Sequence, residues 1–203
     1  MPFFKPQTIF AALMATGAAI LPLRAEEAAL YEAPAPEDAV FVRVLAEFDA
    51  ADKAITFAGQ HLPRGETPAD TYVAISAANL SGVRAGSYYS LAAGSSAPVV
   101  IEEPARETAA KVHLILVNTA TDPVRLIVPT RETEVIAAVT EGAAASRAVN
   151  PIAVTLAVQR VSDGALLGTF DLSLSRGQNM SFIASADSAR LIENSFGPVL
   201  SSN

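Results

Sequence analysis

The 203-residue sequence contains no cysteine, no tryptophan and only two histidines, His61 and His113. The missing cysteines exclude a disulfide framework, a thiolate zinc site, an iron–sulfur cluster and a cysteine nucleophile. Two histidines are also too few for a multi-histidine metal centre. The composition therefore predicts no metal and no cofactor, and it leaves few of the side chains that enzymes use for acid–base chemistry.

Charged residues are sparse at 17%, and 21 acidic residues against 14 basic ones give a net charge of −7. Nucleic-acid-binding proteins carry basic patches, so this balance argues against a nucleic-acid partner. It argues equally against a polybasic surface that binds membranes. What the sequence has instead is a 51% hydrophobic content with only 6% aromatic residues. A chain this rich in small aliphatic residues is expected to fold.

The first 25 residues have the pattern of a secretory signal peptide. Lys5 supplies a positive charge, an uncharged apolar run covers residues 8–23, and Ala25 precedes a pair of glutamates. The alternative is an uncleaved anchor, but the run is shorter than the roughly 20 residues that a membrane-spanning helix needs. We predict that residues 1–25 are cleaved and that the mature chain works in the periplasm. The loss of two cations would bring its net charge to −9.

The rest of the chain has the pattern of short β-strands separated by turns. Apolar and polar residues alternate, or short β-branched runs occur, between clusters of Gly, Pro, Asn, Asp and Ser. Residues 162–164, Ser-Asp-Gly, are typical of a hairpin turn. The pattern predicts an all-β protein of the sandwich or barrel type. The expected strands cover residues 39–45, 71–76, 87–91, 98–101, 111–117, 123–128, 134–139, 152–161, 166–174 and 180–184.

A charged, proline-containing stretch at residues 102–108 separates two strand-rich blocks of similar size. Each block is long enough to form a small β-sandwich. The sequence therefore predicts two small β-sandwich domains in tandem, Ig-like or jelly-roll-like, at residues 39–103 and 109–203. An extended, proline-containing N-terminal arm at residues 26–38 would precede them.

The two blocks also resemble each other faintly. Residues 83–91 and 174–182 both place a turn glycine, Gly86 or Gly177, before a strand with large residues at matching places. An ancient duplication would leave this similarity. Two unrelated β-sandwiches with a common pattern would leave it as well, and the sequence does not decide between them.

No catalytic constellation can be assembled from the sequence motifs. Serines are plentiful, but Gly-x-Ser-x-Gly is absent, and neither histidine has an aspartate two residues before it. Ser87 and Ser90 are weak candidates for an acetyl-relay nucleophile, because no base accompanies them. Adjacent acidic residues such as Glu102 and Glu103 fit a solvated linker. The sequence therefore predicts a protein that is not an enzyme and has no catalytic residue.

Candidate contact residues for a partner or a glycan come from the arm and from the tyrosines. Tyr31, Pro34 and Pro36 lie in the arm, which either docks on a partner or forms a flexible N-terminus. Tyr88 and Tyr89 are neighbours in an expected strand, so one should point inward and the other outward. The outward ring is a candidate for stacking on a partner or a sugar.

Several short motifs follow one another in a family-specific order. They are Leu30-Tyr31, Pro34-Ala35-Pro36, Phe41-Val42-Arg43-Val44, Gly86-Ser87-Tyr88-Tyr89-Ser90-Leu91, Glu102-Glu103-Pro104-Ala105, Val149-Asn150-Pro151-Ile152-Ala153-Val154-Thr155-Leu156-Ala157 and Leu174-Ser175-Arg176-Gly177. In their order and spacing, over most of residues 30–185, the chain resembles the alginate biosynthesis protein AlgF family. Residues 45–52 and 188–203 depart from the family pattern. The resemblance therefore does not identify which polysaccharide is acetylated.

The resemblance implies an accessory protein of exopolysaccharide O-acetylation in the periplasm. Members of this family are expected to be non-catalytic adaptors with two β-sandwich domains. Their partners would be SGNH-like O-acetyltransferases and a membrane-bound O-acyltransferase, with the polysaccharide as a further possible ligand. The alternative function is a periplasmic polysaccharide-binding β-sandwich module. The net negative charge weighs against that alternative, because alginate is itself anionic.

Overall fold

The computed structural model describes residues 34–48, 55–93, 98–106, 108 and 110–200. The expected signal peptide and most of the arm, Tyr31 included, lie outside these residues. Within the described part, no helix is long and apolar enough to cross a membrane. Its regular elements are β-strands and two short 3-10 turns, η2 (Arg64–Glu66) and η3 (Ala77–Asn79). The all-β prediction is confirmed.

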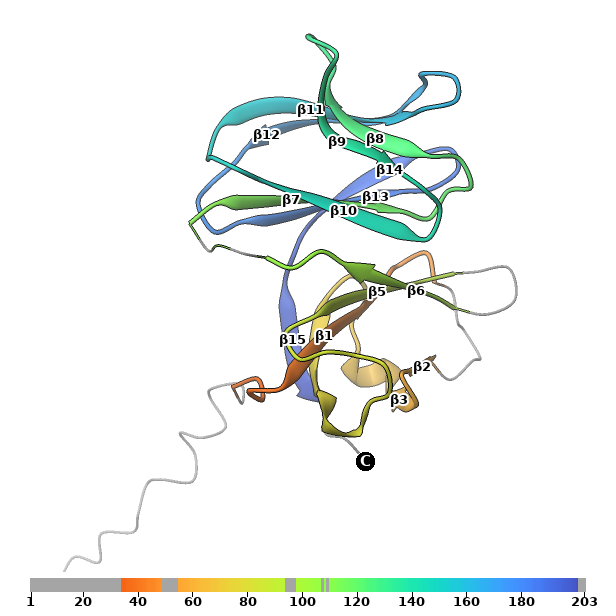
Figure 1. Ribbon diagram of the computed structural model, residues 1–203, viewed down its shortest axis with the longest axis vertical. Coiled ribbons are helices and arrows are strands. Elements are labelled where there is room, and N and C mark those ends of the chain that lie inside the picture. The colour runs from red at the N-terminus through yellow and green to blue at the C-terminus, as the bar shows by residue number, and fades with distance from the viewer. Residues whose placement is uncertain (1–33, 49–54, 94–97, 107, 109, 201–203) are drawn as a thin grey trace, which may run out of the picture. The chain divides into compact units, whose positions relative to one another are not determined.

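Sheet 1 brings together strands that are far apart in the sequence, in the order β15-β4-β1-β5-β6 (Figure 1). A two-stranded hairpin, β2-β3, packs on one of its faces. Val40 and Val42 of β1 meet Phe57 of β2 and Leu62 of β3 in this core. The bounds are β1 (Ala39–Val44), β2 (Ile55–Phe57), β3 (Gln60–Leu62), β4 (Tyr72–Ser76), β5 (Tyr88–Ala92), β6 (Val99–Glu103) and β15 (Phe196–Leu200).

The C-terminal block is a sandwich of two four-stranded sheets. Sheet 2 has the order β10-β7-β13-β14, and sheet 3 has the order β12-β11-β8-β9. Leu116 and Phe182 of sheet 2 pack with Leu126 and Leu156 of sheet 3 in the core between them. The bounds are β7 (Val112–Asn118), β8 (Val124–Val128), β9 (Thr133–Val139), β10 (Ala143–Val149), β11 (Ala153–Arg160), β12 (Leu166–Ser173), β13 (Asn179–Ala184) and β14 (Ala189–Glu193).

Strand β7 is buried at all seven of its positions, because sheet 2 is covered on both faces. Leu114 and Leu116 belong to the core shared with sheet 3. Ile115 and Val117 belong to a second core that also contains Leu45, just after β1, and Ala92 and Ile101 of sheet 1. This double burial explains why the sequence of β7 is apolar at almost every position instead of alternating.

The expected C-terminal domain, residues 109–203, needs one correction. Its last strand, β15, leaves sheet 2 after β14 and pairs in parallel with β4 of sheet 1. Leu200 of β15 is only 3% exposed in the core of sheet 1. The unpaired backbone groups along the edge of β4 favour a fifth strand there. The domain division near residues 102–108 otherwise stays a prediction.

Sheets 1 and 2 repeat one arrangement of four strands. The series β4-β1-β5-β6 and β10-β7-β13-β14 share the same order and the same strand directions. The turn glycines correspond as well, because Gly86 donates its N–H to the Ala39 carbonyl and Gly177 donates to the Lys111 carbonyl. Both glycines have positive φ, 77° and 85°, which glycine adopts most easily. These matches favour duplication as the origin of the two blocks.

The register of the two repeats can be fixed residue by residue. The Phe41 N–H donates to the Ser87 carbonyl at 2.9 Å, and the His113 N–H donates to the Gln178 carbonyl at 3.0 Å. These bonds make Phe41 of β1 equivalent to His113 of β7, and Ser87, just before β5, equivalent to Gln178, just before β13. Ser90 of sheet 1 therefore corresponds to Ser181 of sheet 2.

Candidate functional site

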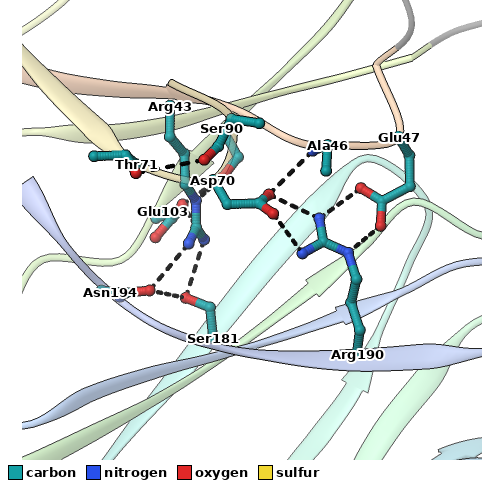
Figure 2. Close-up of polar contacts among 11 residues, drawn as sticks. Arg43, Ala46, Glu47, Asp70, Thr71, Ser90, Glu103, Ser181, Arg190 and Asn194 are labelled. Carbon is teal, nitrogen blue, oxygen red and sulfur yellow. Dashed lines mark hydrogen bonds and ion pairs between the residues drawn. The ribbon is translucent and has the colours of Figure 1, made fainter. Parts of the chain in front are cut away.

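A buried arginine lies where sheets 1 and 2 face each other (Figure 2). Arg43 of β1 is fully buried. Within sheet 1, its Nε donates to Ser90 Oγ at 2.7 Å and its Nη2 donates to Glu103 Oε1 at 2.9 Å. Toward sheet 2, Nη1 donates to Asn194 Oδ1 and Nη2 to Ser181 Oγ, both at 3.0 Å. A buried guanidinium is tolerated here because each of its nitrogens has an acceptor.

The partners of Arg43 occupy equivalent positions in the two repeats. Ser90 corresponds to Ser181, and Glu103 corresponds to Asn194 through the paired registers of β6 and β14. Arg43 thus binds the same pair of positions on both sides of the interface. The apolar residues beside it also correspond: Leu45 with Val117, Ala92 with Ile183 and Ile101 with Ile192. The repeats therefore face each other with equivalent surfaces.

The Glu103 carboxylate is the centre of this network within sheet 1. Ser90 Oγ donates to its Oε1 at 2.6 Å, and the Tyr72 hydroxyl donates to its Oε2 at 2.6 Å. Arg106 Nη2 donates to the Tyr72 hydroxyl oxygen at 2.9 Å. Burial first, and then the nearby negative charge of Glu103, raise the pKa of Tyr72. The phenol therefore keeps its proton and acts as a donor.

A second arginine joins β14 of sheet 2 to the loops around β1 and β4. Arg190 donates from Nη1 and Nη2 to the two oxygens of Asp70, each at 2.8 Å, and it also binds Glu47 (Figure 2). Asp70 also accepts the N–H of Ala46 at 3.0 Å. The hydrogen bond from Arg190 holds the pKa of the Glu47 carboxyl below its usual value. Two arginine clamps thus hold the two repeats together.

Four rings of sheet 1 form an aromatic cluster: Phe41, Tyr72, Tyr88 and Phe196. Tyr88 stacks on Phe41 at 4.9 Å between ring centroids, and Phe196 meets the edge of Phe41 at 5.5 Å. The guanidinium carbon of Arg106 lies 3.6 Å from the centroid of Tyr88 and 4.8 Å from that of Tyr72. Phe196 is 50% exposed, so the cluster reaches the surface.

The predicted contact residues are spread over different environments. Tyr89 points into the core of sheet 1, 5% exposed, and packs on Phe57 at 5.0 Å. Tyr88 is half-buried on the opposite face, as adjacent strand residues require. Pro34 is exposed and Pro36 is half-buried. A contact role for these residues stays a prediction.

The candidate nucleophiles are placed very differently from each other. Ser87 lines a surface hollow of about 510 Å³ that is bounded by residues 84–87 and 102–105. Ser90 is fully buried and bonded to Arg43, so an acetyl donor cannot reach it. His113 is also buried, and its Nε2 lies 2.9 Å from the Thr108 carbonyl oxygen. The relay role considered for Ser90 is therefore wrong.

Arg43, the centre of the buried network, could have been singled out from the sequence as a candidate site residue. Arg43 interrupts an otherwise apolar strand, which marks either an edge or a paired buried charge. Its partners could not be found from the sequence, because Ser181 lies 138 positions away. Among the residues that the structure describes, no group of three or more acidic or histidine side chains is placed to hold a metal ion.

Comparison with known proteins shows which proteins this chain is similar to. The chain is 29% identical over 175 residues to the alginate biosynthesis protein AlgF of Azotobacter vinelandii, covering 76% of each chain. The chain is similar to AlgF over most of its length. The resemblance inferred from the sequence motifs is thereby confirmed, although no protein-family model matches this AlgF-like chain. Among solved structures, the C-terminal domain of AlgF from P. aeruginosa matches with a TM-score of 0.34 and 21% identity, over 41% of this chain and 96% of that domain.

Proposed function

We propose that this AlgF-like chain is a non-catalytic adaptor in the O-acetylation of an alginate-type exopolysaccharide in the periplasm. The observation that carries the proposal is the 29% identity, over 76% of the chain, to a protein named for alginate biosynthesis. The adaptor would bind the periplasmic SGNH-like O-acetyltransferases and the membrane-bound O-acyltransferase. It would support acetyl transfer to the polymer with no nucleophile or cofactor of its own.

The buried serines support the non-catalytic part of this proposal. Ser90 and Ser181 are both fully buried, and both contact Arg43. Acylation of either hydroxyl would require the interface between sheets 1 and 2 to open. The Ser90 hydroxyl donates to the Glu103 carboxylate, but that carboxylate is buried and paired with Arg43, which makes it a poor base. The Ser181 hydroxyl donates to the Asn194 amide oxygen, which is not a base. This geometry fits a structural role, in which the two serines and Arg43 hold sheets 1 and 2 together.

The aromatic cluster supports a role in protein binding. Phe196 is half exposed beside Phe41 and Tyr88, and Arg106 lies against the same rings. Aromatic residues and arginine are enriched at protein interfaces, where a few of them supply most of the binding free energy. The rigid packing of the cluster in the sheet would lower the entropy cost of binding.

The glycan-binding alternative has less support. Sugars stack on the open faces of aromatic rings, but Phe41 and the Arg106 guanidinium lie against the faces of Tyr88. Tyr72 and Tyr89 are buried. The net charge of −7 would also repel an anionic polymer at low salt.

A binding experiment tests the adaptor function directly. The purified chain is titrated by calorimetry with the periplasmic O-acetyltransferase of the same organism and, separately, with alginate. We expect binding to the enzyme and none to the polymer. Phe196→Ala should weaken enzyme binding by roughly tenfold or more, whereas Ile152→Ala, which alters a residue that is 57% exposed in the other block, should not. Binding to alginate alone would overturn the proposal.

A second experiment tests the absence of catalysis. The purified chain is incubated with a chromogenic acetyl ester, and hydrolysis is followed together with that of the Ser87→Ala variant. Ser87 is the relevant position because it lines the open hollow. We expect no hydrolysis above the buffer rate for either protein. Hydrolysis that persists through purification and disappears in Ser87→Ala would identify an enzyme.

A further inference from the structure

Sheet 1 contains a strand for which sheet 2 has no counterpart. β15 pairs in parallel with the outer edge of β4. The equivalent of β4 in sheet 2 is β10, which pairs with β7 on one side. On its other side, β10 has no hydrogen-bonded neighbour among the strands that the structure describes. The duplicated arrangement thus has an occupied fifth position in one sheet and an open one in the other.

The register of the repeats identifies the groups at the open position. Residues 42 and 114 are equivalent, and they pair with Val73 and Arg147 respectively. Tyr72 therefore corresponds to Ser146. The Tyr72 N–H donates to the carbonyl oxygen of Ser195, just before β15, at 3.0 Å. The Ser146 N–H is the equivalent donor at the edge of β10.

The hydrogen bonds of β7 show which amides of β10 point outward. His113 and Thr119 of this segment donate toward β13, so the odd-numbered residues of β7 bond to that strand. The even-numbered residues bond to β10, and Leu114 is opposite Arg147. Arg147 is therefore already bonded to β7. Ser146 and Ala148, its neighbours, direct their N–H and carbonyl groups away from the sheet.

The edge of β10 lacks two of the features that usually prevent strand addition, a bulge and a proline, although it carries one exposed charge, Arg147. Its seven residues pair with β7 without a bulge, and none of them is proline. Three of the other five edges of sheets 1 to 3 differ, because the pairings of β15, β9 and β12 all contain register shifts, and β15 includes Pro198. The edges β6 and β14 are regular, as β10 is. Bulges and proline protect edge strands from pairing with other chains. β10 is a regular edge without a bulge or a proline.

The strand that lies over β10 does not prevent pairing. Gly142, next to the start of β10, lies close to the Val99 side chain of β6. In the other repeat, Arg190 of β14, which corresponds to Val99, binds Asp70, shortly before β4. Since β4 accepts β15 in spite of that contact, we expect the corresponding arrangement to leave room beside β10.

The surroundings of the edge indicate the chemistry of its occupant. A hollow of about 190 Å³ near the start of β10 is lined by Val99 and Ile101 and by one exposed carboxylate, Glu141. Farther along, Ala148 is small and exposed, so an apolar side chain of a partner could pack on it. A complementary segment would therefore be extended and apolar, with a lysine or arginine that reaches Glu141.

We propose that the outer edge of β10 accepts an extended segment of a partner protein, which adds to sheet 2 in parallel as β15 adds to sheet 1. Main-chain hydrogen bonds to Ser146 and Ala148 would supply affinity, and side chains in the adjoining hollow would supply specificity. The identity of the partner, the periplasmic O-acetyltransferase, rests on the proposed adaptor function.

Amide hydrogen exchange tests this pairing residue by residue. The isotope-labelled full chain is exchanged with and without saturating O-acetyltransferase, quenched and read by NMR. Exchange at Ser146 and Ala148 should slow by roughly tenfold or more when their N–H groups become bonded. Ala145 and Arg147, already bonded to β7, should change little. Slowing that is equal at all four amides would indicate general stabilisation and would overturn the proposal.

Backbone variants provide the second test. Ala148→Pro removes an outward N–H, so it should weaken enzyme binding by about tenfold or more. Ala148→Ser keeps the N–H and should bind within about threefold of the unchanged chain. Circular dichroism and urea unfolding show whether each variant is folded. If Ala148→Pro does not fold, the hydrogen-exchange experiment alone tests the pairing. Full affinity of a folded Ala148→Pro chain would refute strand addition at β10.

The outcomes separate this inference from the adaptor function. If the enzyme binds the unchanged chain but protects neither Ser146 nor Ala148, the adaptor stands and the β10 site is wrong. If the enzyme neither binds nor alters exchange, both proposals fail. If protection of these amides occurs while Phe196→Ala retains full affinity, the β10 edge is the binding surface and the aromatic cluster is not.

Discussion

Replacing Arg43 with methionine should destabilise the protein strongly, although methionine nearly fills the same space. The variant removes four hydrogen bonds, two within sheet 1 and two across the interface to sheet 2. It also leaves the Glu103 carboxylate, which is fully buried, without its nearest cation. An unpaired buried charge is the main contribution to the expected loss.

The magnitude follows from what remains around the carboxylate. Removing one partner of a buried ion pair typically destabilises a protein by about 3–5 kcal/mol. Here Tyr72 and Ser90 still donate to Glu103, and Arg106 Nη2 lies 3.5 Å from its Oε2. These contacts offset part of the loss, so we expect about 3 kcal/mol. For a chain of this length that lowers Tm by roughly 6–12 °C.

Urea unfolding measures this change. Far-UV circular dichroism and tyrosine fluorescence serve as probes, since the chain has no tryptophan. In Arg43→Met/Glu103→Gln the buried charge is gone while an acceptor remains for Tyr72. The double variant should therefore lose about 1–3 kcal/mol less than the two single losses added together. A loss below about 1 kcal/mol for Arg43→Met, or strict additivity, would refute the argument that charge pairing at the interface dominates.

Three further changes have clear expected outcomes. Phe182→Ala should lose about 3–5 kcal/mol in urea unfolding, because the ring is fully buried between sheets 2 and 3, and a loss no larger than that of the exposed Ile152→Ala would contradict this. The folded-state pKa of Glu47 is lowered, so its contribution to stability is complete above the ordinary value of 4.5 and disappears as pH falls through the folded-state pKa. In Arg190→Ala, the free energy of unfolding should therefore fall less between pH 4.5 and lower pH than it does in the unchanged chain. The same fall in both proteins would show that the Arg190–Glu47 pair does not contribute to stability. Gly86→Ala should lose about 1–2 kcal/mol from its φ of +77° alone, because no atom lies within 4 Å of an added Cβ, and a neutral thermal melt would contradict this.

Much of the fold could be predicted from local pattern. The apolar runs and turn residues located strands such as β1, β4, β7, β11 and β13, because alternation and β-branched residues report burial within a single strand. The pattern was less useful for β10 and β14. The Ala-rich sequence of β10 has little β-propensity, and it becomes a strand because it pairs with β7.

The candidate site depended much more on tertiary structure. That Tyr88 and Tyr89 point to opposite faces follows from the two-residue period of a strand, but which of them is buried does not. The four partners of Arg43 do not follow from it, since they come from four segments up to 151 positions apart. Phe196 was also missed, because the segment that carries it pairs with a sheet from the other block.

The sequence by itself determined the class of this protein: its all-β composition, the absence of thiol and multi-histidine chemistry, and a relationship to AlgF carried by ordered short motifs. Those properties depend on residue types and local spacing, which a single chain displays directly. The tertiary structure decided that two repeats face each other across Arg43, that β15 crosses to sheet 1 and that β10 pairs on only one side among the described strands. These features depend on strand pairing and buried charge between distant segments, and local sequence does not encode either one.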